Sequence, residues 1–78
     1  MQDVDTDTRL GLDLADRVKI ARERRGWSQS ELAQRLGMTR PQLCNLEHGQ
    51  TRNLTAMTLY RLAKALGVSM EWLWTGEE

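Results

Sequence analysis

The sequence predicts a small all-helical protein. Apolar residues recur in several segments at the three- and four-residue spacing of a helix face, and glycine stands where most of these segments stop. No segment alternates apolar and polar residues with the period of two that marks a strand. A length of 78 residues fits one domain, near the lower limit at which an apolar core alone suffices for folding.

The chain divides into three predicted parts. Residues 1–9 are acidic and are expected to form a flexible tail. Residues 10–76 carry the helical spacing and are expected to form the folded domain. Residues 77–78 are expected to be a tail or the start of a linker.

The first two helices have clear boundaries. The first is expected to run from about Leu10 to Arg25 and to stop at Gly26. The second opens at Ser28, because residues 28–31 fit the S-x-x-E capping box, and it ends at Gly37. Their buried faces are predicted to consist of Leu14, Val18, Ala21, Leu32, Ala33 and Leu36.

The third, fourth and fifth helices each follow a hydroxyl residue that can serve as the N-cap. Thr39 opens the third helix, Thr55 the fourth and Ser69 the fifth, and Gly67 ends the fourth. A polar loop, Gln50–Leu54, separates the third helix from the fourth. The apolar residues of these three helices are Leu43, Leu46, Leu59, Leu62, Ala63, Leu66, Met70, Trp72, Leu73 and Trp74.

The composition excludes several classes of protein. The one cysteine, Cys44, cannot form an internal disulfide, which favours a reduced, cytoplasmic protein. A run of about 18 apolar residues and the apolar segment of a signal peptide are both missing, so neither a membrane span nor secretion is expected. No set of catalytic residues, phosphate loop or metal-ligand cluster stands out, so we expect no enzyme and no cofactor.

Charge is unevenly distributed along the chain, although the formal net charge is zero. All eleven basic residues lie within residues 9–64, which hold five acidic residues and therefore carry +6. A compact unit with this charge favours a polyanionic partner. The same balance is also compatible with an ordinary solvated surface.

The second and third helices, joined by a tight turn at Gly37, have the pattern of a helix-turn-helix. A small residue, Ala33, stands where the two helices approach closely. The leucines of both helices bury the inner faces, which leaves the outer side of the third helix free for a groove. At about 100° per residue, that outer side is predicted to carry Pro41, Gln42, Cys44, Asn45 and His48.

Arg22 and Glu47 each lie beside an apolar stripe, about 40° from Val18 and from Leu43 respectively. Burial of either charge alone would be costly. We therefore expect a partly buried ion pair between Arg22 and Glu47 that ties the first helix to the third. Two unrelated side chains that extend to solvent are the alternative.

Three segments carry the pattern of a known family. Residues 29–37 read QSELAQRLG, residues 43–49 read LCNLEHG, and residues 62–76 read LAKALGVSMEWLWTG. These segments resemble the helix-turn-helix family of the phage repressor and Cro proteins, the Xre-like transcriptional regulators. The likeness runs from about Arg17 to Gly76 and implies a compact, five-helix, lambda-repressor-like DNA-binding domain.

The resemblance also implies how such a domain contacts double-stranded DNA. It places four residues of the third helix at the major groove, where polar side chains hydrogen-bond to base edges: Arg40, Pro41, Gln42 and Asn45. It implies phosphate contacts from Gln29, Thr39, Gln50, Thr51, Arg52, Asn53 and Arg17. A plain first-turn residue is the alternative for Gln29, and a solvated side chain is the alternative for Arg17.

Two residues depart from the family pattern. Pro41 stands where a polar side chain would contact bases, and because the residue before a proline resists the helical region, Arg40 is an alternative N-cap. Cys44 is expected to be a small neutral residue, with a thymine contact or oxidant sensing as alternatives.

His48 has no second metal ligand at a suitable spacing and is expected to lie on the surface or to contact a phosphate.

Trp72 and Trp74 cannot share one helix face at their spacing of two. One is expected to complete the core and the other to lie exposed at a dimer interface, although a single exposed tryptophan also needs no partner.

The sequence therefore predicts a transcriptional regulator, a repressor, that binds an inverted repeat as a homodimer. An antitoxin or a restriction-modification controller of the same fold, and an interaction module that does not bind DNA, are the alternatives. Phage repressors often continue into a second domain, and in that setting the chain is expected to be a fragment.

Overall fold

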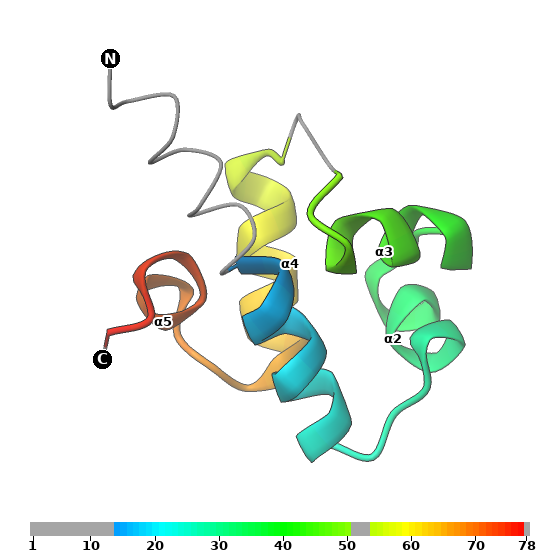
Figure 1. Ribbon diagram of the computed structural model, residues 1–78, viewed down its shortest axis with the longest axis horizontal. Coiled ribbons are helices and arrows are strands. Elements are labelled where there is room, and N and C mark those ends of the chain that lie inside the picture. The colour runs from blue at the N-terminus through cyan, green and yellow to red at the C-terminus, as the bar shows by residue number, and fades with distance from the viewer. Residues whose placement is uncertain (1–13, 51–53, 78) are drawn as a thin grey trace.

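We describe a computed structural model of the protein over residues 14–50 and 54–77. These residues form five helices and no strand, which confirms the predicted fold class (Figure 1). The first helix is described over residues 14–24. It is followed by α2 (Gln29–Leu36), α3 (Arg40–Glu47), α4 (Ala56–Leu66) and α5 (Met70–Thr75).

The N-caps of α2 to α5 are those that the sequence predicts. The caps have extended backbone, and each side-chain oxygen accepts a hydrogen bond from the amide three residues later. They are Ser28, Thr39, Thr55 and Ser69. The structure also contains the predicted capping box of α2, in which Glu31 accepts from the Ser28 amide at 2.8 Å.

The alternative that Arg40 caps α3 is wrong, because Thr39 is the N-cap and Arg40 is the first helical residue. Thr39 and Gln42 form a second capping box: the Gln42 amide donates to the Thr39 hydroxyl at 3.2 Å, and the Thr39 amide donates to the Gln42 side-chain oxygen at 2.9 Å. These two bonds hold the first turn in place against the restriction that Pro41 imposes on its predecessor.

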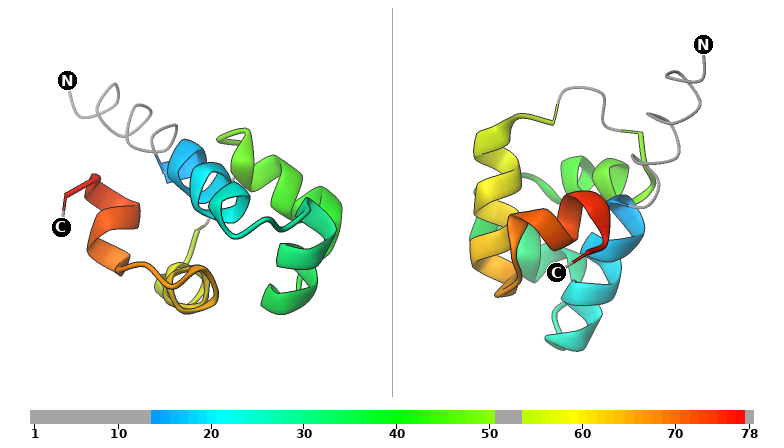
Figure 2. Two further views of the ribbon diagram at one scale, coloured as in Figure 1. Left: turned by 90° about the horizontal axis from the view of Figure 1, so that it is seen from below. Right: turned by 90° about the vertical axis from the view of Figure 1, so that its left-hand side faces the viewer.

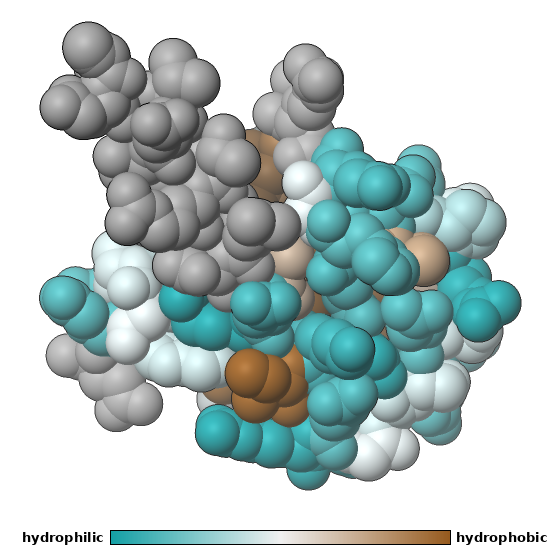
Figure 3. Space-filling model, viewed as in Figure 1, coloured by the Kyte–Doolittle hydropathy of each residue, from teal (hydrophilic) through white to brown (hydrophobic). Residues whose placement is uncertain are grey.

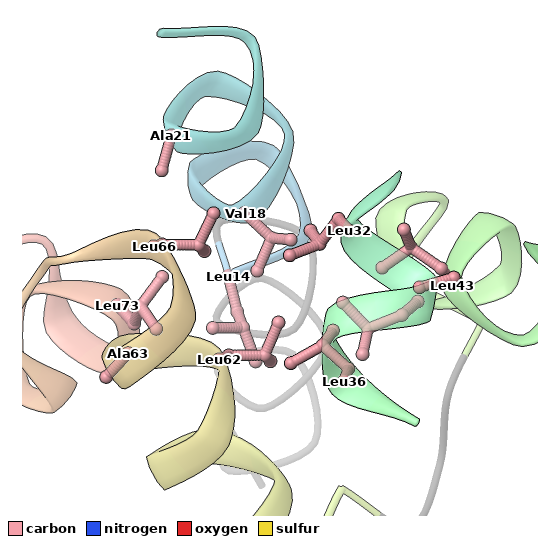
Figure 4. Packing of buried hydrophobic residues seen from close by; sticks show 12 residues of the cluster. Leu14, Val18, Ala21, Leu32, Leu36, Leu43, Leu62, Ala63, Leu66 and Leu73 are labelled. Carbon is pink, nitrogen blue, oxygen red and sulfur yellow. The ribbon is translucent and has the colours of Figure 1, made fainter. Parts of the chain in front are cut away.

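One hydrophobic core joins all five helices (Figure 4). Val18, Leu32, Leu43, Leu62 and Leu73 are its fully buried members, and each comes from a different helix. Burying such a side chain contributes about 1.5–3 kcal/mol, so this set ties every helix to the same centre. Most of the predicted apolar residues are buried as expected. Leu59, Met70 and Trp72 are half-buried and pack against the core, and Trp74 is exposed.

The helices are arranged so that α2 packs on α3 and on α4, and α4 packs on α5. The α2–α3 pair and α5 lie at opposite ends of the molecule, with the first helix and α4 between them (Figures 1 and 2). None of the described helices is long and apolar enough to cross a bilayer.

Candidate nucleic-acid interface

The outer side of α3 is exposed and polar. Arg40, Pro41, Gln42 and Asn45 are all exposed, whereas Leu43, Leu46 and Glu47 of the same helix are buried. Cys44, expected on the outer side, is half-buried. Outside the grey residues, the face of the molecule seen in Figure 3 is mostly hydrophilic, with hydrophobic surface confined to small patches.

A tight turn fixes α3 relative to α2. Gly37 has a φ of +71°, the left-handed conformation that favours glycine, and the Met38 amide donates to the Ala33 carbonyl at 3.0 Å. The chain therefore leaves α2 and enters α3 within two residues, Met38 and Thr39. This connection is the turn of the predicted helix-turn-helix.

A buried ion pair fixes the other end of α3. Arg22 Nε donates to Glu47 Oε2 at 2.7 Å, and Nη2 donates to Oε1 at 3.1 Å. Arg22 Nη1 also donates to the Trp27 carbonyl at 2.8 Å. The hydrogen bond to Glu47 raises the pKa of Arg22, against the opposing effect of burial. The geometry is the one expected from the sequence, and it joins the first helix to α3.

Gln29 takes part in the same network. Its Nε2 donates to Glu47 Oε1 at 3.1 Å, and the residue is half-buried at the start of α2. An amide nitrogen carries two hydrogens, so one remains for a phosphate oxygen. The bond to Glu47 holds the Gln29 side chain in one orientation beside α3.

The predicted base-reading residues differ in how free their side chains are. The Gln42 oxygen accepts from the Thr39 amide, so its NH₂ group is the part left to meet a base. The Arg40 and Asn45 side chains form no hydrogen bond with the described residues. The Pro41 side chain has no hydrogen-bonding group. A bidentate contact is therefore open to Arg40 and Asn45, while Gln42 has to weaken its cap to make one.

The structure does not support a phosphate contact by Arg17. Its Nε donates to the Leu73 carbonyl at 2.8 Å and its Nη2 to the Trp74 carbonyl at 2.9 Å. The guanidinium thus caps the C-terminal end of α5, at the opposite end of the molecule from the α2–α3 pair (Figure 1).

Arg25 has a similar role that the sequence analysis missed. Its Nε donates to the Leu66 carbonyl at the end of α4, at 3.2 Å. Both contacts join residues more than 40 positions apart, so no local spacing indicates them.

The loop after α3 is described only in part. Gln50 is exposed, and its backbone amide donates to the Asn45 carbonyl at 2.9 Å. The predicted phosphate contacts of Thr51, Arg52 and Asn53 lie outside the described residues. The Thr39 hydroxyl accepts from the Gln42 amide and can still donate its own hydrogen.

Cys44 and His48 lie one turn apart at the edge of this face. His48 Nδ1 is 2.7 Å from the Cys44 carbonyl oxygen and 3.4 Å from Cys44 Sγ, and the bond to the carbonyl requires the tautomer with hydrogen on Nδ1. Within residues 14–50 and 54–77, no group of three or more His, Cys, Asp or Glu side chains is placed to hold a metal ion.

The two tryptophans of α5 have different surroundings. Trp72 is half-buried and packs against the core, whereas Trp74 is 46% exposed. Trp74 lines a hollow of about 270 Å³ at the start of α4. The other residues of this hollow are Leu54, Thr55, Ala56 and Leu59.

Two short helices joined by a tight glycine turn, with a buried inner side and an exposed polar second helix, define a helix-turn-helix domain. Residues 18–73 match the model of the helix-turn-helix family. The chain belongs to the helix-turn-helix family of DNA-binding regulators.

Two relatives illustrate this membership. The chain is 35% identical to antitoxin HipB of Escherichia coli (strain K12) over 57 residues, which are 73% of this chain and 64% of that protein. It is 48% identical to the uncharacterized HTH-type transcriptional regulator y4dJ of Sinorhizobium fredii over 48 residues, which are 62% of this chain and 61% of that protein. The chain thus spans slightly less than two thirds of these curated relatives.

Solved structures show the same fold. The hypothetical transcription factor NHTF from Neisseria superposes with a TM-score of 0.77 at 32% identity, over 83% of this chain and 74% of that one. The restriction-modification controller protein C.AhdI from Aeromonas hydrophila superposes with a TM-score of 0.72 at 31% identity, over 80% of this chain and 92% of that one.

Proposed function

We propose that the protein is a transcriptional repressor that binds an inverted-repeat DNA site as a homodimer, with α3 in the major groove. The observation that carries this proposal is the exposed polar side of α3 in a chain of the helix-turn-helix family. Helices of this kind fit the major groove, where each base pair presents a distinct pattern of donors and acceptors.

Base reading is assigned to Arg40 and Asn45, with a lesser part for Gln42. A guanidinium pairs with two acceptors of guanine, and a side-chain amide pairs with a donor and an acceptor of adenine. Each such bidentate contact contributes about 1–3 kcal/mol of discrimination. The Arg40 and Asn45 side chains form no hydrogen bond within the part of the chain that the structure describes, which supports this assignment.

Phosphate contacts are assigned to the residues that flank α3. Gln29 begins α2, Thr39 is the N-cap of α3 and Gln50 follows α3, and Thr51, Arg52 and Asn53 come next in the sequence. Such contacts set the register of the protein on the duplex without reading its sequence. The position of Gln29, held by Glu47, supports its role as an anchor.

The dimer is assigned to the surface around Trp74. An exposed tryptophan beside an apolar hollow at the start of α4 offers area that a second copy can cover. A twofold dimer matches an inverted repeat, with half-sites about one helical turn apart.

Two biological settings fit this function. One is an antitoxin, as HipB is named, and the other is a restriction-modification controller, as C.AhdI is named. A toxin gene beside the gene for this chain favours the first setting, and a restriction endonuclease gene favours the second.

Selection of bound duplexes from a random pool, at about 100 mM salt, tests the function. We expect enrichment of an inverted repeat whose conserved base pairs change in the Arg40→Ala and Asn45→Ala variants. Salt-sensitive binding to every duplex without enrichment contradicts sequence reading. Absence of binding replaces the proposal with an interaction module that does not bind DNA.

A further inference from the structure

Three basic side chains gather where the end of α2 meets α4. Arg35 of α2 and Arg61 and Lys64 of α4 line one hollow of about 680 Å³, together with Tyr60. The remaining lining residues are Gln34, Leu36, Gly37 and Ala65, so no acidic residue lines the hollow. We call Gln34, Arg35, Tyr60, Arg61 and Lys64 the α2/α4 basic surface.

These cations are partly oriented before any partner arrives. The Arg35 guanidinium carbon lies 4.2 Å from the centroid of the Trp27 ring, and Lys64 Nζ lies 5.8 Å from the centroid of the Tyr60 ring. Arg61 is exposed and forms no hydrogen bond with the described residues. Tyr60 is 47% exposed and adds an apolar ring with a hydroxyl group to the surface.

Arg61 and Lys64 of this surface are not paired with carboxylates of the described residues. The guanidinium groups of Arg17, Arg22 and Arg25 are bonded to acceptors of the protein. In contrast, the part of the chain that the structure describes provides no carboxylate within salt-bridge distance of Arg61 or Lys64. Within residues 14–50 and 54–77, the surface therefore keeps its positive charge for an external anion.

The α2/α4 basic surface lies beside the outer side of α3 and is distinct from it. A neighbouring hollow of about 430 Å³ is lined by Gln42 and Asn45 and shares Arg61 with the surface. Gln29, the phosphate anchor, is at the opposite end of α2, which at eight residues is about 12 Å long. A partner on this surface would adjoin bound DNA.

We propose that the α2/α4 basic surface docks an acidic segment of another protein, with carboxylates on Arg61 and Lys64 and an apolar side chain against Tyr60. The hollow between α2 and α4 is shallow, and the exposed ring of Tyr60 in its lining can pack against an apolar side chain of a peptide. A DNA duplex is a broad convex rod, which gains little from a hollow or from an apolar ring at its phosphates. The exposed ring of Tyr60 among the cations therefore favours a protein segment with an apolar side chain over nucleic acid.

Anisotropy of a fluorescein-labelled peptide tests the proposal without DNA, so its outcome is separate from that of the repressor assignment. The probe is a peptide of repeated Glu-Glu-Leu-Glu units, and the control probe has Gln at every Glu. We expect the wild-type protein to bind the Glu peptide and to bind the Gln peptide at least about tenfold more weakly, with affinity falling as salt rises.

The decisive variant is the double change Arg61→Glu and Lys64→Glu, and the control matched in charge is the double change Lys19→Glu and Arg24→Glu at two exposed residues of the first helix. We expect the double variant to lose at least about tenfold in affinity for the Glu peptide and the control to stay within about twofold. Because Arg61 lies beside Gln42 and Asn45, the same charge reversal is also expected to weaken binding to a random duplex, so the peptide titration carries the test. Should charge reversal unfold the domain, Tyr60→Ser replaces it.

Three results would overturn the proposal. The wild-type protein fails to bind the Glu peptide, or the double variant and the control bind it equally. In the third, the double variant loses duplex affinity and keeps peptide affinity, which assigns the surface to nucleic acid instead.

Discussion

Arg22 donates to both carboxylate oxygens of Glu47, although 25 positions separate the two residues in the chain. Their side chains are 10% and 2% exposed, so the pair is largely withdrawn from water. Removing one partner of such a pair leaves an uncompensated charge, which lowers the free energy of unfolding by about 3–5 kcal/mol. We expect this loss for Glu47→Ala, measured by urea denaturation.

Glu31→Ala is the matched control, because Glu31 is an exposed glutamate whose carboxylate, among the described residues, bonds only the Ser28 amide. Its loss is expected to be about 1 kcal/mol or less. An unchanged midpoint for Glu47→Ala contradicts a stabilising role for the pair.

The raised pKa of Arg22 predicts how this contribution varies with pH. A group whose pKa is raised on folding stabilises the protein fully below its ordinary pKa, and the effect is lost as pH rises through the folded-state value. For an arginine that window lies at strongly alkaline pH. The difference in unfolding free energy between wild type and Arg22→Met is therefore expected to be constant from about pH 6 to about pH 9. A difference that fades in this range would show that the pairing depends on another titrating group.

Arg17→Ala separates the structural role of Arg17 from a role in DNA binding. Loss of the two bonds to the Leu73 and Trp74 carbonyls is expected to lower the free energy of unfolding by about 1–2 kcal/mol. Duplex affinity, measured well below the unfolding temperature, is expected to stay within about twofold. Lys19→Ala, an exposed change on the same helix, is the control for stability. A tenfold loss of DNA affinity by a folded Arg17→Ala protein would restore the phosphate contact.

Gln42→Glu distinguishes the two tasks of this side chain. A glutamate can accept from the Thr39 amide as Gln42 does, and a negative charge in the first turn is favourable, so stability is expected to hold within about 0.5 kcal/mol. The donor to a base edge is lost and a negative charge faces the duplex, so affinity is expected to fall at least about tenfold. Gln42→Ala also removes the acceptor of the Thr39 amide, so the free energy of unfolding is expected to fall by about 1 kcal/mol. Equal DNA affinity of wild type and Gln42→Glu would exclude Gln42 from the interface.

Trp74→Glu tests the dimer. Trp74 is exposed in the single chain, and a glutamate in its place becomes a buried charge when the proposed dimer forms. The dissociation constant of the dimer, measured by analytical ultracentrifugation, is therefore expected to rise at least about tenfold. Ile20→Glu is the control, since Ile20 is a large exposed apolar residue of the first helix. If wild-type protein is a monomer well above micromolar concentration with and without DNA, the dimer assignment fails.

The sequence predicts most of the fold because its signals are local. Ser28, Thr39, Thr55 and Ser69 mark the helix starts through bonds three residues long, and the leucine spacing marks each buried side. The Arg22–Glu47 pair could be inferred because both residues flank apolar stripes. The Thr39–Gln42 capping box had a sequence signal, the T-x-x-Q spacing, that the base-reading interpretation overlooked.

The contacts of Arg17, Arg25 and Arg35 could not be predicted in the same way. Each depends on which helix end or aromatic ring the tertiary fold brings to the guanidinium, and a flexible side chain reaches any of several neighbours. For the same reason the charge of residues 9–64 overstates what is free for DNA. The net charge of a sequence includes every cation, but Arg17, Arg22 and Arg25 are bonded to acceptors of the protein in the folded structure.

The contact between Arg17 and the end of α5 also has a consequence for local opening. With six residues, α5 is too short to be a stable helix by itself, and it depends on the burial of Leu73 and on the cap from the first helix. Detachment of the first helix removes that cap at the same moment. The amides of α5 are therefore expected to exchange with solvent hydrogen together with those of the first helix, which makes the two ends of the described chain one cooperative opening unit.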